Sequence, residues 1–591
     1  MRILQIVHDF LPRHVAGVEV YTDHVARALA RDHDVALLYT ECLPEEPNYS
    51  LRRGRHEGVA TYEIANNHLY ADFEERYRNP AVEALVREVL DEFRPDVVHV
   101  QHLIHLSLGV LDELDRRGIP SVMTLHEHWF TCANGGQRFH RDLGRCDVLD
   151  ARRCAACTAP MHGARALAPG AADAGSLALA CAEPDAVETP DARYVYRDRY
   201  LLHGAARPTW VAHPPARLAF AVEAGEGAAF RAHVAMHPST FETDGGAVRF
   251  AVHVDGAARA EVRLDPRREP QHRFPRAVEV PLAPGAHRLE LCSASDPPDA
   301  LEFATGGWID PRVDGGRLAP RNLRERAARA GARLAERLGR GERARTRAAV
   351  ERRWDAVRAA ARGVDLFLLP SRYLLGEMAR FGLPRERMIH CDYGFPTDAF
   401  ARRADLPERA RRFAFIGSVM RHKGMHVLLE AFEGLPHDAE LLVAGSPAYD
   451  PGYAVWLQGS ARHPGVRFVG GVPPAAVPGF LAGVDALVVP SIWQENSPLT
   501  IHEGFLAGIP VVASRMGGSS ELIEAGGGLL YDADDPLALR AALLRLYEEA
   551  GLARGLAAAA PPVKSLKEHV AELVELYDRV RFARGRAHAD A

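Results

Sequence analysis

The sequence predicts an α/β protein with two doubly wound, Rossmann-like parallel sheets and an antiparallel β-sandwich inserted into the first of them. Short apolar runs alternate with helical periodicity up to about residue 160, and again after about residue 365. Between about residues 194 and 313 the apolar period switches to two, which is typical of an antiparallel sandwich. A chain of 591 residues is also too long for a single core.

The first sheet is predicted from apolar runs near the N-terminus. Ile3 to Val7 is a candidate for a buried strand, and a loop with Gly17 and an apolar stripe at helical spacing follow it. The further strand candidates of this sheet are Val35–Tyr39, Asp96–Val100, Ser121–Leu125 and, after the insertion, Leu366–Pro370.

The insertion follows a stretch rich in Ala, Pro, Gly and Asp, from about residue 165 to 191, which is typical of a linker. Alternating apolar residues such as Val248, Phe250 and Val252 predict its strands. Ala319 to Arg362 is then rich in Arg and Ala and is helical by propensity.

The second sheet begins near Arg411. Its strand candidates are Phe413–Ile416, Glu440–Ala444, Val466–Val469, Ala486–Val489 and Pro510–Ala513. We therefore expect an N-terminal domain made of 1–165 and a helical return at 320–405, a sandwich at 194–315 and a C-terminal domain at 406–575.

Composition and charge narrow the classes of function. A net charge of −6 gives no electrostatic reason to expect nucleic acid as a partner. The first residues carry no signal-peptide pattern, and no run approaches the ~18 apolar residues that span a bilayer. We therefore expect a cytoplasmic protein.

The strongest functional signal follows the strand that ends at Pro490. A polar loop comes next, and a helix begins near Pro498 with Ser497 as a candidate N-cap. Glu495 and Glu503 can then both face the carboxyl edge of the sheet. Carboxylates there accept hydrogen bonds from sugar and ribose hydroxyls, and the helix N-terminus offers N–H groups to phosphate. The two glutamates alone could equally be a solvated pair.

The run ENSPLTIHEGFLAGIPVVAS at residues 495–514, with the glycines that follow it, resembles the donor-site signature of retaining glycosyltransferase family four, of the GT-B fold. The resemblance implies that Glu495 contacts hydroxyls of the donor sugar and Glu503 those of the ribose. The other donor-binding residues expected in this stretch are Ser497, Pro498, Leu499, Gly517 and Gly518.

A second motif supports the same resemblance. Gly417 opens the run GSVMRHKG, residues 417–424, after a predicted strand. Fixed cations there would stabilise the negative charge that a diphosphate leaving group develops. The resemblance implies that Lys423 holds the diphosphate. The family usually places an Arg directly after the glycine; here that position is Ser418, and Arg421 is the candidate that reaches in instead.

The N-terminal lobe supplies a third element. Gly17 lies where the family usually shows two adjacent glycines, with Ala16 in the first place. The run TLHEHW, residues 124–129, resembles the family's strand end that carries a histidine beside the transferred sugar, and His126 matches that histidine. In isolation, His126 could simply cap a strand.

Two other features leave alternatives open. Cys132, Cys146, Cys154 and Cys157 could complete a structural zinc site or could be free thiols. The closing strand of the sandwich resembles those of jelly-roll, carbohydrate-binding modules, where an exposed Trp308 could stack on a sugar or could lie in the core.

The Arg-rich segment Arg321 to Arg362 could lie on the anionic inner face of a membrane and bring the enzyme to a lipid-linked acceptor. It could also be a solvated helical face.

We therefore expect a retaining hexosyltransferase that moves a sugar from a nucleotide-diphosphate donor to a glycan or lipid-linked acceptor, as in polysaccharide biosynthesis. No catalytic metal is expected, because four sulfur ligands would leave no open coordination position. The resemblance implies that the departing diphosphate helps to deprotonate the acceptor. Two alternatives stay open: a GT-B nucleotide-sugar epimerase, and a non-catalytic glycan-binding or scaffold protein, which Ser418 and the single Gly17 would fit.

Overall fold

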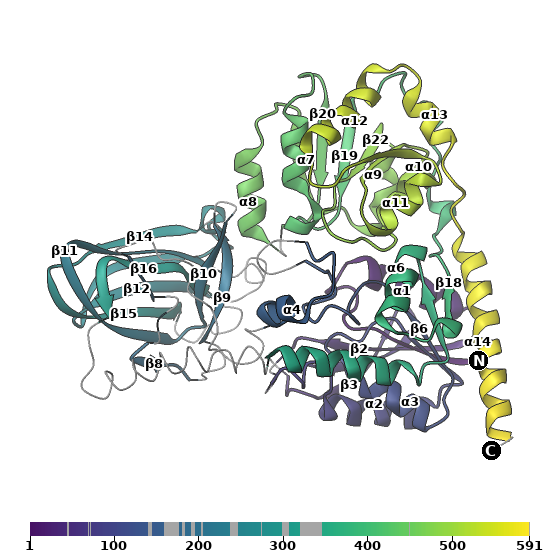
Figure 1. Ribbon diagram of the computed structural model, residues 1–591, viewed down its shortest axis with the longest axis horizontal. Coiled ribbons are helices and arrows are strands. Elements are labelled where there is room, and N and C mark those ends of the chain that lie inside the picture. The colour runs from purple at the N-terminus through teal and green to yellow at the C-terminus, as the bar shows by residue number, and fades with distance from the viewer. Residues whose placement is uncertain are drawn as a thin grey trace.

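The computed structural model has two α/β lobes, one above the other, and a β-sandwich beside them (Figure 1). This arrangement confirms the predicted fold class. The structure describes residues 1–43, 46–68, 70, 72–139, 145–158, 176–179, 182, 184–190, 195–202, 205–236, 246–273, 275–297, 306–318, 346–447 and 450–589.

The sheet of the first lobe has, in the described residues, the strand order β18-β17-β6-β5-β1-β2-β4-β3. Its neighbours are parallel except for the β3–β4 hairpin. The sequence did not predict β3, because its exposed run LRRGRH carries no apolar pattern. The bounds are β1 Arg2–Ile6, β2 Asp34–Glu41, β3 Leu51–His56, β4 Val59–Ala65, β5 Val97–Val100, β6 Ser121–Thr124, β17 Leu366–Leu369 and β18 Met388–His390.

Helices cover both faces of this sheet. Ile3 of β1 faces α1 and α14, whereas Leu4, on the opposite face, packs with α2, α3, α6 and the helical residues 346–361. Burial on both faces explains why the strands are continuous apolar runs. The helices are α1 Gly17–Leu29, α2 Pro80–Phe93, α3 Gly109–Arg116, α4 Ala151–Thr158 in the cysteine-bearing loop, α6 Arg372–Phe381 and α14 Leu566–Ala589.

The second lobe has a parallel sheet of order β21-β20-β19-β22-β23-β24. Its strands are β19 Arg412–Ile416, β20 Glu440–Ala444, β21 Val466–Gly470, β22 Ala486–Val489, β23 Val511–Ser514 and β24 Gly528–Tyr531. Its helices are α7 Met425–Phe432, α8 Pro451–Ser460, α9 Val477–Leu481, α10 Leu499–Ala507, α11 Gly517–Glu524, α12 Pro536–Glu548 and α13 Leu552–Ala558.

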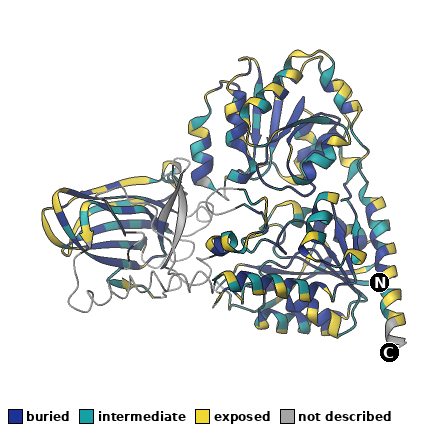
Figure 2. Cartoon of the chain, viewed as in Figure 1, coloured by how far each residue is buried: buried dark blue, intermediate teal, exposed yellow. Residues whose placement is uncertain are grey.

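The sandwich is inserted between β6 and β17 and has its own core. The long strand β11 joins its two layers, since its first half pairs with β15 and its second half with β14 and β16. Buried residues face its interior and exposed ones mark its outer surface (Figure 2). The strands are β7 Ser176–Ala178, β8 Ala186–Glu188, β9 Val195–Leu202, β10 Ala205–Ala212, β11 Ala216–Met236, β12 Ala247–Val254, β13 Ala257–Leu264, β14 Arg276–Pro281, β15 Gly285–Asp296 and β16 Gly306–Leu318.

The structure decides between the two alternatives for Trp308 and corrects the expectation of a linker. Trp308 lies in the core, fully buried, with its ring edge-to-face against Phe250 at a centroid distance of 5.5 Å, so it cannot stack on a sugar. The predicted linker at 165–191 contributes the strands β7 and β8, although most of it lies outside the described residues.

The Arg-rich segment lies outside the described residues up to residue 345. Its described end packs on the first lobe rather than on a membrane: Val350 and Val357 are fully buried. Arg353 donates hydrogen bonds to the carbonyl oxygens of Trp129 and Phe130, at 2.6 and 3.2 Å. Throughout the described ranges, no helix combines the length and apolar character that a bilayer crossing requires.

The chain passes between the lobes twice, once before β19 and once before α14. The two passages lie side by side: Phe395 forms a parallel β-bridge with Ser565, its N–H donates to Lys564 O at 3.0 Å, and its carbonyl accepts from Leu566 N–H at 2.6 Å. The C-terminal helix α14 then returns to the first lobe, where Tyr577 bonds to His99 Nδ1 at 2.6 Å.

Candidate functional site

The predicted site residues follow the carboxyl ends of strands in each sheet. In the second lobe they come after the neighbouring strands β19, β22 and β23, and in the first lobe after β1 and β6, which lie on either side of β5. The carboxyl ends of parallel strands share one edge of a sheet, so this topology gathers the residues of each lobe at one edge.

Lys423 and Glu495 form an ion pair. Lys423 Nζ lies 2.7 Å from Glu495 Oε1, and the hydroxyl of Ser491 donates to the same oxygen at 2.6 Å. The ammonium also lies 5.0 Å from the ring centroid of Trp493. Glu495 is only 5% exposed, so this charge pair is largely shielded from water. An ammonium and a carboxylate are thus held side by side at the carboxyl edge of the sheet.

Gly517 and Gly518 let α11 begin against the loop that carries Glu495. A Cβ on Gly517 would lie 2.1 Å from the carbonyl oxygen of Glu495, and one on Gly518 would lie 1.5 Å from that of Asn496. Gly517 also has a φ of +51°, and the Gly518 N–H donates to Glu495 O at 2.8 Å. These glycines therefore position the Glu495 backbone.

Glu503 lies on α10 and is partly buried. Burial raises the pKa of this carboxyl to about 7. Among the described residues, no side chain or backbone group bonds to it. A desolvated carboxyl with spare acceptor capacity suits a hydroxyl-bearing ligand.

The expectation that Ser497 is the N-cap of α10 is wrong. The N-cap residue is Pro498, and no side chain caps the helix. The hydroxyl of Ser497 instead donates to Asp392 Oδ1 at 2.9 Å and lies 2.9 Å from His502 Nε2. The prediction failed because Asp392 comes from the first lobe, which offers a stronger, charged acceptor.

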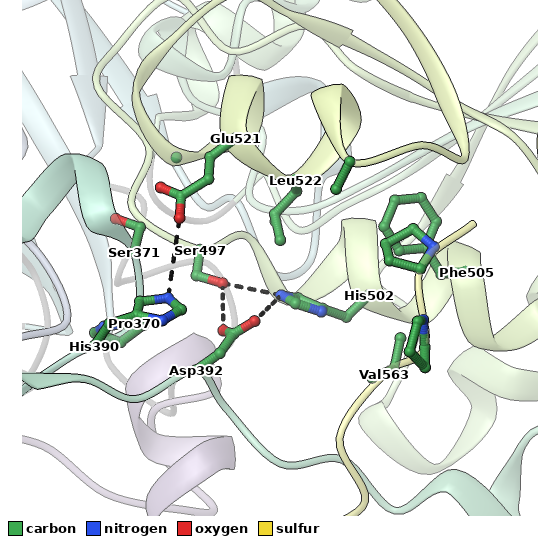
Figure 3. Close-up of a pocket in the computed structure, with 14 residues that line it drawn as sticks. Pro370, Ser371, His390, Asp392, Ser497, His502, Phe505, Glu521, Leu522 and Val563 are labelled. Carbon is green, nitrogen blue, oxygen red and sulfur yellow. Dashed lines mark hydrogen bonds and ion pairs between the residues drawn. The ribbon is translucent and has the colours of Figure 1, made fainter. Parts of the chain in front are cut away.

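Figure 3 shows this contact between the lobes, with Ser497 between Asp392 and His502, and Glu521 facing His390. The residues surround a cavity of about 170 Å³. Its lining comes from β17 and β18 of the first lobe, from α10 and α11 of the second, and from the second chain passage at Pro561–Val563.

His126 is 7% exposed, and both of its ring nitrogens are engaged. Nε2 donates to Gln101 Oε1 at 2.9 Å, and Nδ1 accepts from the hydroxyl of Tyr393 at 2.7 Å. Burial, and then the charges of His102 and His99, hold its pKa well below the ordinary value. The imidazole is therefore neutral, in a defined tautomer.

Asn496 joins the two lobes, a role that sequence reasoning missed. Its Nδ2 donates to the carbonyl oxygens of Leu125 and His126, at 3.1 and 3.0 Å, and its Oδ1 accepts from Ser371 Oγ at 2.5 Å. Its one signal in the sequence was its place directly after Glu495. Through Asn496, the strand end of His126 and the carboxylate loop of Glu495 are in direct contact.

Gly17, at the first turn of α1, faces the start of α10. A Cβ on Gly17 would lie 3.5 Å from Leu499 Cδ1, so the two predicted residues meet across the lobes.

Gly417 follows β19 and its carbonyl approaches Gly445 closely. Arg421 lies near enough to lower the pKa of His426, whose main shift comes from burial.

The four clustered cysteines do not support a zinc site. They share one region, since Cys132, Cys146 and Cys157 contribute to raising the pKa of Cys154 to about 12, after the larger effect of burial. In the described part of the chain, however, no three of their sulfur atoms lie within 4.8 Å of one another. The described residues therefore give no support to a tetrahedral thiolate site, the first of the two alternatives.

Two family models match the two lobes. The model described as "Glycosyltransferase Family 4" matches residues 15–168, and "Glycosyl transferases group 1" matches residues 410–549. Both predicted motifs of the second lobe, at residues 417–424 and 495–514, lie inside the match to residues 410–549.

Curated relatives match part of the chain. A D-inositol 3-phosphate glycosyltransferase of Xylanimonas cellulosilytica is 34% identical over 175 residues, which is 28% of this chain and 42% of the relative. The D-rhamnosyltransferase WbpZ of Pseudomonas aeruginosa is 30% identical over 26% of this chain and 41% of its own length. The matches thus span less than half of the length of these relatives.

Solved structures with a similar arrangement include the sucrose-phosphate synthase of Thermosynechococcus elongatus, with a TM-score of 0.47 and 14% identity over 100% of this chain and 98% of that one. The catalytic domain of starch synthase IV from Arabidopsis thaliana has a TM-score of 0.48 and 12% identity over 98% of this chain and 99% of that one.

Proposed function

We propose a reaction for this chain on the premise that it belongs to glycosyltransferase family four, of the GT-B fold. The chain transfers a sugar from a nucleotide-diphosphate-sugar to a hydroxyl group of an acceptor, with retention of the anomeric configuration. The observation that carries this proposal is the Lys423–Glu495 pair, held at the carboxyl edge of the second sheet and joined through Asn496 to the strand end of His126.

Lys423 binds the diphosphate of the donor. In the structure its ammonium neutralises Glu495 at 2.7 Å, so a phosphate oxygen takes over part of that role when the donor binds. As the bond between sugar and phosphate breaks, negative charge grows on the diphosphate, and the partly buried ammonium stabilises it. Arg421 and the amide groups at the starts of α10 and α11 add positive potential on the same side.

Glu495 and Glu503 bind hydroxyl groups. Glu495 accepts from the donor sugar, and its position next to Lys423 keeps the sugar beside the diphosphate. Glu503 accepts from the ribose, and a bound hydroxyl favours its ionised form. Ser497, Pro498, Leu499, Gly417, Gly517 and Gly518 shape the donor pocket around these two carboxylates.

The first lobe presents the acceptor. Gly17 and His126 lie on its side of the contact with the donor lobe. A neutral His126 with both nitrogens engaged orients groups rather than shuttling protons. The departing diphosphate therefore takes the proton of the acceptor hydroxyl on the same face, which gives retention. A glycan or a lipid-linked glycan in the cytoplasm is the acceptor that this proposal favours.

A screen of nucleotide sugars tests the proposal. The purified chain is incubated with each donor, with and without saccharide acceptors, and release of nucleoside diphosphate and the anomer of the product are followed by NMR. We expect transfer, or slow donor hydrolysis without acceptor. An isomerised nucleotide sugar would indicate an epimerase, and a folded chain that binds no nucleoside diphosphate would indicate a scaffold.

Paired variants separate the site from general effects on folding. Lys423→Ala should lower kcat by about 10²-fold or more, since it removes a charge that the transition state needs. Lys567→Ala removes an exposed lysine and should leave kcat unchanged. Equal activity of the two variants would remove Lys423 from the site.

A further inference from the structure

Three metal-ligating side chains converge where α14 meets the first lobe. Cys391 follows β18, and His569 and Glu572 lie three residues apart on one face of α14. One potential ligand atom of each lies within 4.8 Å of the other two. Cys391 and His569 are 3% and 1% exposed, so the group is largely closed to solvent.

One atom of this cluster is left without a hydrogen bond of normal geometry. His569 Nδ1 is buried and has no hydrogen bond in the structure. It lies 3.9 Å from Glu572 Oε2, which is too long for a hydrogen bond. A buried, unpaired imidazole nitrogen is costly, and a cation held between it, the thiol and the carboxylate would satisfy it.

The other ring nitrogen is oriented as in protein metal sites. His569 Nε2 lies 2.7 Å from the hydroxyl of Tyr21, on α1. Ligating histidines usually donate their second N–H to such a partner, which fixes the tautomer and the direction of the free nitrogen. Tyr21 is buried, and Gly394 leaves room for His569, since a Cβ there would lie 2.3 Å from His569 Cβ.

We propose that Cys391, His569 and Glu572 bind one divalent cation of the zinc class, which fastens α14 to the first lobe. Thiolate, imidazole and carboxylate are all zinc ligands, and the mixture of sulfur and nitrogen favours zinc over magnesium or calcium. Water supplies the fourth ligand, because the Glu572 side chain is 37% exposed. Binding releases the proton of the buried Cys391 thiol.

Lys564 and Asp392 are charged neighbours of this site. Lys564 Nζ lies 2.6 Å from Glu572 Oε2 and donates to the carbonyl oxygen of Asp392 at 3.2 Å. The same Glu572 oxygen lies 3.9 Å from His569 Nδ1, so a bound cation shares this carboxylate with the lysine. The cation, one thiolate and one carboxylate together are neutral, and Lys564 and Asp392 add charges of opposite sign beside them.

Metal content of the full chain tests the proposal. The purified chain is stripped with a chelator, reloaded with Zn²⁺, and its metal is counted by mass spectrometry; we expect about one equivalent per chain. Loading with Co²⁺ instead should give a thiolate-to-cobalt charge-transfer band. Less than a tenth of an equivalent after reloading would overturn the proposal.

Variants assign the ligands. Cys391→Ser should abolish the charge-transfer band, and the half-exposed Glu572→Gln should weaken Zn²⁺ binding by about 10-fold or more while the chain stays folded. Cys154→Ser is the matched control and should keep the metal. If Glu572→Gln and Cys391→Ser keep it and Cys154→Ser loses it, the metal belongs to the cysteine cluster and this proposal is wrong.

Discussion

At the scale of single residues, the surroundings of Glu503 determine the protonation state of its carboxyl. Its carboxyl is desolvated and has no partner among the described residues, so its pKa rises to about 7, from an ordinary 4.5. Because the folded chain holds this proton more tightly than the unfolded chain, the resulting contribution to stability is fully present below pH 4.5 and is lost as the pH rises through about 7.

Nucleotide binding should show the opposite trend. A bound ribose hydroxyl favours the ionised carboxylate, so the affinity for nucleoside diphosphate should rise as the pH increases towards about 8. Glu503→Gln should flatten this dependence and weaken binding by about 10- to 100-fold at pH 8. Isothermal titration calorimetry from pH 5.5 to 8.5 measures both effects. Glu524→Gln, at an exposed position, is the control, and a pH dependence retained in Glu503→Gln would assign it to another group.

A substitution at Gly518 tests the close approach of α11 to the loop that carries Glu495. In Gly518→Ala the added Cβ would lie 1.5 Å from Asn496 O, so the loop that carries Glu495 must move. We expect a loss of about 1–3 kcal/mol in the free energy of unfolding and weaker donor binding. Gly555→Ala on α13 meets no atom within 4 Å and should be neutral or stabilising. Thermal unfolding of both variants measures this difference in stability.

At the scale of elements, the loop between β22 and α10 couples the lobes through Asn496. In Asn496→Asp, carboxylate oxygens would face the carbonyl oxygens of Leu125 and His126 and repel them. Transfer should fall by about 10²-fold, because the acceptor side shifts relative to the donor. The affinity for nucleoside diphosphate should stay within about 3-fold.

A double-mutant cycle with Ser371 checks this role of Asn496. The variants Asn496→Ala and Ser371→Ala remove two ends of one bond, so their effects on transfer should not be additive. Additive effects, or an equal loss of nucleotide affinity in Asn496→Asp, would contradict a coupling role.

The elements that the sequence predicts well are those that are buried on both faces. β19, β20, β22 and β23 appear within a residue of the predicted bounds, because each is a short apolar run that ends in polar loop residues. β3 escaped prediction because its stability comes from pairing with β4 at an exposed sheet edge.

The residues of the candidate site also fall into two groups, those that the sequence predicts and those that it misses. Lys423, Glu495 and Glu503 are visible in motifs because each belongs to a short strand–loop–helix unit, Lys423 after β19 and the two glutamates after β22. Asn496 and Ser497 act through partners more than 100 residues away in the sequence, which no local spacing reveals. Their roles in donor binding stay predictions.

At the scale of the whole molecule, the sandwich has a core separate from those of the lobes. Trp308→Ala empties the centre of that core and should cost the sandwich about 3–5 kcal/mol. Differential scanning calorimetry should show two transitions, of which this variant lowers one. A nucleoside diphosphate should raise the other one. A single transition that responds to both would show that the sandwich and the lobes unfold together.

The paired passages at Phe395 and Ser565 set how the molecule can open. Two covalent links that run side by side and are hydrogen-bonded to each other form a hinge. They allow the lobes to rotate about one axis but oppose sliding along it. Asn496 and Ser497 are consecutive residues of one loop, so rotation about this axis would break their contacts with His126 and Asp392 together.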